Sequence, residues 1–91
     1  MTDAKSIEKA MKKHIDDAAR ETNSLKKRND MFKAEPVVYD LLNIGVELGR
    51  AVMCCDILRV DFNQDMSDYT GIIEEIKTKA YETYKEITGG I

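Results

Sequence analysis

The sequence has little of what most catalytic and metal-binding sites are built from. Its 91 residues include no tryptophan, one histidine, one proline and two cysteines. Cys54 and Cys55 are chain neighbours that would point about 100° apart on a helix, which is poor geometry for a mutual disulfide. His14 is the only histidine, so a zinc site lacks further ligands, and we interpret it as a packed side chain. These features predict a reduced, cytoplasmic protein.

Long apolar runs and phosphate-binding loops are also missing. The first 18 residues lack the apolar stretch of a secretory signal. The most apolar segment, residues 36–60, is interrupted by Glu47, Arg50 and Asp56, so it falls short of the roughly 20 apolar residues that span a bilayer. No glycine-rich phosphate loop or nucleophile motif occurs. We therefore expect no membrane association, no catalytic residues, no cofactor and no metal.

The composition that remains is typical of a small, soluble, helical protein. Charged residues make up 34% of the chain and hydrophobic residues 43%, with a net charge of −3. A chain of this length forms one helical domain over residues 1–91. Domains this small bury only about 60–65% of their unfolded surface, so association with a second copy would add useful burial.

The segment from Pro36 to Val60 is predicted to be the central helix. Proline suits the first helical position, and about 25 residues follow without a turn signal. One narrow polar stripe runs along this helix: Pro36, Asp40, Asn43, Glu47, Arg50 and Cys54. The rest of the circumference is apolar, which predicts packing neighbours on at least two sides.

Two further helices flank the central one. Apolar residues in steps of three and four predict a helix from Asp3 to Lys33, continuous through the less apolar Thr22–Ser24. The same spacing predicts a helix from Met66 to Thr88, which Gly89 and Gly90 end. The expected fold is an all-α three-helix bundle that assembles as a homodimer.

The central helix also offers a candidate interface. On the side of this helix that we expect to be buried, Gly45 and Gly49 share one face with Val52 and Asp56. Each glycine costs about 1 kcal/mol against alanine in a helix interior. Such a face favours close approach of another helix, inside the chain or between subunits, and a flat ligand or nucleotide is the alternative. Asp56 is expected to pair with Arg59, three residues on.

The first helix is predicted to be longer than the central one and to overhang it. Its last turns contain Leu25 and Phe32, which we expect to pack on a second subunit. Its two basic clusters, Lys12–Lys13 and Lys26–Lys27–Arg28, are candidate phosphate contacts for nucleic acid. Acidic residues interleave with these clusters, so a solvated face is the favoured interpretation.

The link between the second and third helices imitates a calcium loop. Its oxygen side chains match the first four ligand positions: Asp61, Asn63, Asp65 and Ser67. Met66 and Ile72 then stand where that loop needs glycine and glutamate. We predict a turn instead, with Asp65 or Ser67 capping the third helix.

A metal-dependent nucleotide pyrophosphohydrolase of all-helical type is the enzymatic alternative. It needs acidic pairs that converge on Mg²⁺, and Asp40, Asn43 and Glu47 offer one half of such a site. No second acidic pair is expected to face them. The favoured function is therefore a non-enzymatic interaction protein, such as a regulator, inhibitor or adaptor, that binds a protein partner and itself.

Overall fold

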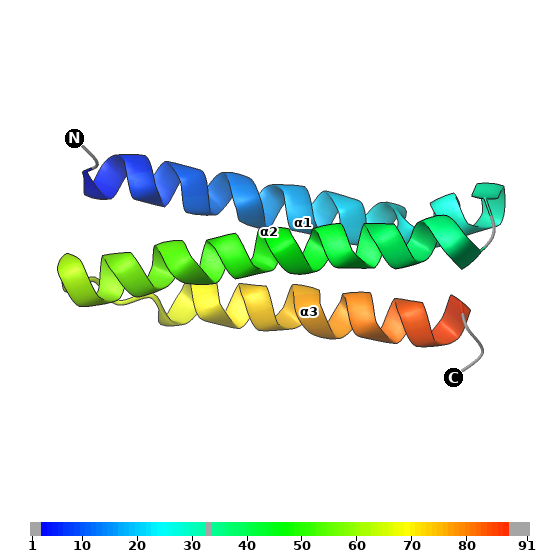
Figure 1. Ribbon diagram of the computed structural model, residues 1–91. Coiled ribbons are helices and arrows are strands. Elements are labelled where there is room, and N and C mark those ends of the chain that lie inside the picture. The colour runs from blue at the N-terminus through cyan, green and yellow to red at the C-terminus, as the bar shows by residue number, and fades with distance from the viewer. Residues whose placement is uncertain (1–2, 33, 88–91) are drawn as a thin grey trace.

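A computed structural model describes residues 3–32 and 34–87, with the side chains of residues 3–25 and 39–86. Within these ranges the chain forms three helices and no strand: α1 (Ala4–Phe32), α2 (Ala34–Asp61) and α3 (Ser67–Ile87). Each helix runs antiparallel to the next in an elongated bundle (Figure 1), which measures 43 × 22 × 15 Å. The predicted all-α three-helix fold is confirmed, and the predicted helix ends agree within two residues.

Local hydrogen bonds define the helix ends. At the start of α1, Asp3 Oδ1 accepts a bond of 2.8 Å from the Ser6 amide, and this bond lowers the pKa of Asp3. At the start of α3, Asp65 Oδ1 accepts a 3.0 Å bond from the Ser67 amide, which confirms the predicted cap. Between α2 and α3 the backbone of Asn63 is left-handed, with φ of 52°, a conformation that asparagine tolerates better than most residues.

The weak point of the α1 stripe does not interrupt the helix. Thr22 is only 3% exposed, and its hydroxyl donates a 2.7 Å bond to the carbonyl oxygen of Ala18. Ser24 makes the same kind of bond to Arg20, at 3.0 Å. A buried hydroxyl costs little when it is bonded in this way, so a polar residue can occupy a core position here.

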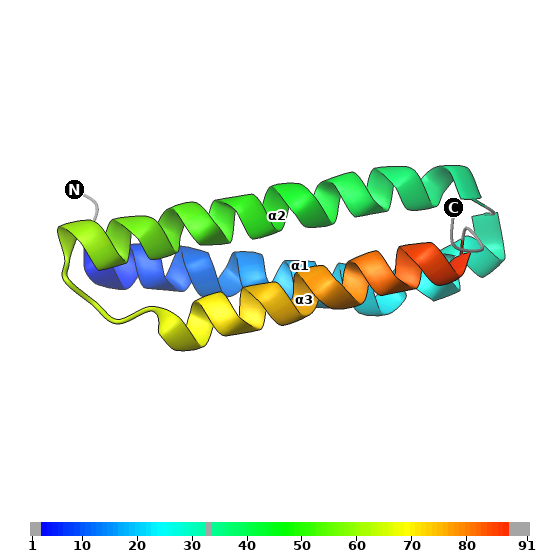
Figure 2. The ribbon, with the colours of Figure 1, turned by 90° about the horizontal axis from the view of Figure 1, so that it is seen from below.

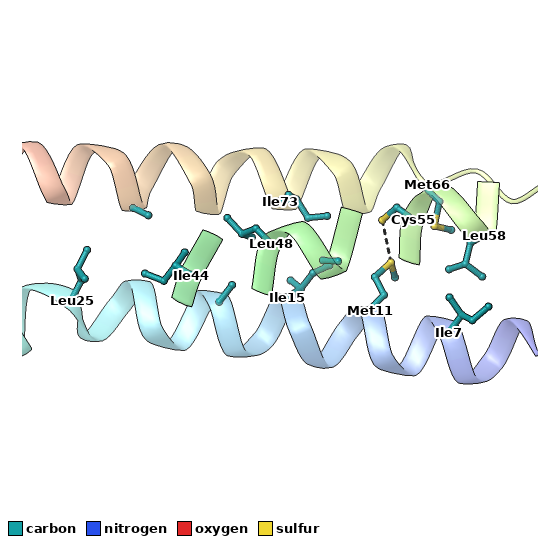
Figure 3. Packing of buried hydrophobic residues seen from close by; sticks show 13 residues of the cluster. Ile7, Met11, Ile15, Leu25, Ile44, Leu48, Cys55, Leu58, Met66 and Ile73 are labelled. Carbon is teal, nitrogen blue, oxygen red and sulfur yellow. Dashed lines mark hydrogen bonds between the residues drawn. The ribbon is translucent and has the colours of Figure 1, made fainter. Parts of the chain in front are cut away.

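The core is a row of apolar side chains that follows the bundle axis, with contributions from all three helices (Figure 3). Its largest fully buried members are Met11, Leu25, Ile44, Leu58 and Cys55. The sulfur atoms of Met11 and Cys55 lie 3.2 Å apart. Because Leu25 is completely buried in the core of its own chain, the prediction that it packs on a second subunit is wrong.

The helices do not surround α2. It contacts both α1 and α3, and Figure 2 shows both of them on the same side of it. The sequence predicted packing neighbours on at least two sides of this helix, but within the described chain both neighbours lie on one side of it. The opposite side of α2 has no packing neighbour among the residues whose side chains are described.

Candidate functional site

The exposed side of α2 is the most apolar surface of the bundle. Of the ten large hydrophobic residues exposed in the described part of the chain, seven belong to α2: Tyr39, Leu42, Val46, Val52, Met53, Ile57 and Val60. Exposure reaches 62% for Leu42, 64% for Met53 and 71% for Val60. Scattered single residues of this kind are normal on protein surfaces, whereas a continuous row on one helix is typical of an interaction site.

The row has the spacing of a coiled-coil interface. Steps of three and four residues alternate along the whole helix, through a set that we name the outer seam: Tyr39, Leu42, Val46, Gly49, Met53, Asp56 and Val60. This is the heptad pattern with which one helix packs along another. The core side of α2 has similar spacing, through Ile44, Leu48, Ala51, Cys55 and Leu58. One helix therefore has two packing faces, and α1 and α3 cover only one of them.

The exposed row extends along most of α2. From Tyr39 to Val60 it covers about 32 Å of helix, at 1.5 Å per residue. A row of this length can pack along a second helix over its whole extent, as in a coiled coil.

The glycines lie on this exposed face and not at a crossing within the chain. A Cβ atom built on Gly45 or Gly49 meets nothing within 4 Å. The expectation that they pack against another helix of the same chain is therefore wrong. Val52 and Asp56 are exposed on the same side, and the predicted pair of Asp56 and Arg59 is confirmed at 3.1 Å. Contact of this face with a second subunit stays a prediction.

Part of the predicted polar stripe of α2 faces the bundle. Asp40 is 8% exposed, and Glu47 Oε2 lies 2.6 Å from His14 Nδ1, with both side chains part-buried. Arg50 lies 3.7 Å from the other oxygen of Glu47. His14 is thus a packed residue in contact with a carboxylate, in agreement with its interpretation from the sequence. Asp40 and Glu47 thus lie on the side of the bundle, whereas Asn43 and Arg50 of the same stripe are exposed.

A second acidic pair does face α2, contrary to prediction. Asp17 and Glu21 follow His14 on α1 in steps of three and four, and the charges of Asp17, Asp40 and Glu47 all act on Glu21. We name these four side chains the carboxylate cluster. The periodicity contained the signal, since Glu21 directly precedes the core position Thr22. No group of three or more His, Cys, Asp and Glu among the described residues is arranged to hold a metal ion.

The surroundings of Glu21 within the cluster disfavour the charged form of its side chain. Its Oε2 atom is buried without a hydrogen-bond partner. Burial raises the pKa of Glu21, and the carboxylates of Glu47, Asp17 and Asp40 raise it further, against a smaller opposing effect of Arg20. The Glu21 carboxyl thus binds its proton more tightly in the folded state than in the unfolded chain. The protonated group therefore contributes to the free energy of unfolding at low pH, and this contribution is lost as pH rises through the raised pKa.

Replacement of Glu21 with glutamine is therefore expected to stabilise the protein at pH 7. The gain should be about 1 kcal/mol, because glutamine removes the charge that burial and three neighbouring carboxylates disfavour. This corresponds to roughly 4–8 °C in melting temperature for a domain of this size. Thermal melts followed by circular dichroism at pH 7 and at about pH 4 test this, with Glu86→Gln on the exposed side of α3 as control. An equal gain at both pH values would show that charge is not the cause.

Metal ions are expected to leave the stability unchanged. A ligand that binds only the folded state raises the melting temperature in proportion to its binding free energy. Since we expect no metal to bind, melts in EDTA, Mg²⁺, Ca²⁺ and Zn²⁺ should coincide. A reproducible rise with Mg²⁺ that disappears in Glu21→Gln would contradict this and would locate a cation site at the carboxylate cluster. A rise with Ca²⁺ that persists in that variant would point to the loop at residues 61–68.

The basic clusters are only partly within the described side chains. Lys12 and Lys13 are exposed, and Lys12 Nζ lies 3.2 Å from Glu8 Oε1. This contact with Glu8 raises the pKa of Lys12. Lys26, Lys27, Arg28 and Phe32 lie outside the described side chains. Lys12 is therefore already paired with an acidic neighbour, as the interleaved charges of α1 predicted.

Two surface hollows lie away from the glycines. One of about 420 Å³ lies where α2 meets α3, between Cys55, Arg59 and Thr70. The other, of about 220 Å³, lies between α1 and α3, where Lys79 donates a 2.6 Å bond to Asn23. Neither Gly45 nor Gly49 lines either hollow, so a small-ligand site at the glycine face gains no support from them.

Similarity to known proteins gives no guide to the function of this chain, so the surface of α2 is the main one. None of the three described helices is long and apolar enough to cross a membrane. No protein family model, curated protein or solved structure matches the chain.

Proposed function

We propose that this chain is a non-enzymatic helical interaction protein that acts as a homodimer, with the outer seam of α2 as its interface. The supporting observation is the exposed heptad row from Tyr39 to Val60. Water contact with such a row is costly, at about 25 cal/mol per Å² of apolar surface. Covering it would stabilise the whole domain.

A second copy of the chain is the occupant that fits the seam best. A heptad row is complementary to another heptad row, since side chains of one helix fill the gaps between those of the other. A two-fold dimer brings the same patch from both subunits together and closes, so it buries the seam twice without leaving a free end. The charge of Asp56 is balanced by Arg59 in the same chain, so the seam has little net charge to repel a copy.

The dimer would be the binding unit of a small regulator, inhibitor or adaptor. It presents the polar outer faces of α1 and α3 twice, which suits a protein partner with repeated sites. We place it in the cytoplasm, because Cys54 and Cys55 are both free thiols and such thiols are common in reducing compartments.

The mass of the particle in solution tests this proposal. Light scattering at micromolar concentration should give twice the 10.4 kDa of one chain. A monodisperse particle of a single chain would refute the homodimer, and the seam would then need a different protein to cover it.

A pair of glycine variants tests whether the seam is the interface. Gly49→Leu should raise the dissociation constant about 5- to 150-fold, because overpacking costs about 1–3 kcal/mol. Gly71→Leu on α3 is the matched control, since an added Cβ atom at either position meets nothing within 4 Å in the single chain. A dimer that is equally stable in both variants would remove the glycine face from the interface.

A further inference from the structure

The order of residues along the outer seam distinguishes between the ways in which two copies of α2 can pair. Asp56 is the only charged member of the seam, and it lies near one end of the helix, three residues from its partner Arg59. Tyr39 lies near the other end and is the only member with a hydroxyl group. This asymmetry makes parallel and antiparallel pairs unequal.

A parallel pair would place every seam residue beside its own copy. Asp56 would then meet the partner's Asp56 at a buried position, and like charges in such a position repel each other. The two helix dipoles would also point the same way, which adds a smaller penalty. Parallel pairing therefore places two carboxylates side by side near one end of the contact, each with only Arg59 of its own chain as a partner.

An antiparallel pair avoids this conflict in one particular register. With Val46 opposite the partner's Gly49, Leu42 lies opposite the partner's Met53, and the missing side chain of Gly49 leaves room for Val46. In the same register Tyr39 lies opposite the partner's Asp56, so its hydroxyl group can donate a hydrogen bond to that carboxylate. The polar groups of the seam then satisfy each other at both ends, and apolar residues fill the middle.

Sliding the partner by one heptad gives a poorer match. Asp56 would then lie opposite the partner's Val46, which offers no donor beyond the Arg59 guanidinium of its own chain. Tyr39 would lie opposite residue 63, which is beyond the end of α2. This register lacks the hydrogen bond between Tyr39 and Asp56, so it is disfavoured.

The bundle leaves room for such a pair. Both α1 and α3 lie on the core side of α2 (Figure 2), so a second copy can approach the outer seam without meeting either of them. We infer that two copies of the chain pair through α2 in an antiparallel arrangement, with Leu42 against the partner's Met53 and Tyr39 against the partner's Asp56. This inference rests on the proposed function, since it specifies the geometry of the proposed dimer.

Cysteine cross-linking tests the arrangement. Leu42→Cys and Met53→Cys are made separately in a Cys54→Ala, Cys55→Ala background and oxidised alone and as a 1:1 mixture of exchanged subunits. A disulfide needs Cα atoms about 4.4–6.8 Å apart. In the proposed register each residue lies 11 positions, or about 16 Å along the axis, from its own copy. The mixture should therefore form a Leu42→Cys to Met53→Cys disulfide in up to half of the dimers, and each variant alone should form almost none.

The outcomes separate the two proposals. Cross-linking of Leu42→Cys with itself would show a parallel pair, and a dimer without the mixed disulfide would show another register; both overturn the inference and keep the dimer. A particle of monomer mass in the reduced samples would instead overturn the proposed function. Thr78→Cys on the exposed side of α3, mixed with Leu42→Cys, measures random collisional cross-linking.

Discussion

Replacement of Met53 with glutamate is expected to convert the proposed dimer into a monomer of 10.4 kDa that keeps its helical content. Met53 is 64% exposed in the single chain, so a glutamate there is solvated and costs the protomer little. In the dimer the same change buries two charges without partners. A buried charge without a partner costs about 3–5 kcal/mol, so the dissociation constant should rise at least about 100-fold. Light scattering and circular dichroism on the same sample measure both effects.

The matched control is Thr78→Glu, which places the same charge on the exposed side of α3. It should leave both mass and helical content unchanged. If both variants remained dimeric, the contact surface would lie elsewhere on the bundle. If Met53→Glu lost its helices as well, the single chain would be shown to need the dimer in order to fold.

Truncation of Leu58 to alanine should be among the most damaging single changes in the core. Leu58 is completely buried and lies beside Ile7 in the row between the helices (Figure 3). Leucine-to-alanine changes at such sites cost about 2.7–5 kcal/mol, from lost burial and from the cavity that remains. This is a large part of the roughly 5–14 kcal/mol of stability expected for a chain of this length.

The measurement is best made by urea unfolding in the Met53→Glu background, where dissociation does not contribute to the transition. Ile72→Ala on α3 is the control, because Ile72 is 41% exposed and should cost less than about 1 kcal/mol. Equal losses at the two positions would contradict the assignment of Leu58 to the core.

Periodicity was sufficient to predict the three helices but not the orientation of α2. Its apolar residues cover most of the circumference, so hydrophobicity alone does not decide which side faces the bundle. The contact between His14 and Glu47 helps to decide it, because it places Glu47 on the side of α2 that faces α1. Contacts between residues 33 positions apart in the chain have no signature in local spacing.

The glycines illustrate the same limit. Gly45 and Gly49 share a face, as their spacing predicts, but the prediction that this face is the buried side of the helix is wrong. A small residue, however, has the same spacing whether a neighbour approaches it or solvent does. The empty space around both positions shows that no other segment of the described chain requires a glycine there.

The two packing faces of α2 make the stability of the protein depend on its concentration. If one side of this helix completes its own domain and the other holds a second copy, unfolding of either chain also separates the pair. Dilution would then act as a mild denaturant, because each tenfold drop in concentration weakens the folded pair by about 1.4 kcal/mol. The level of expression would in this way set how long each molecule survives, and a scarce chain would be cleared sooner than an abundant one.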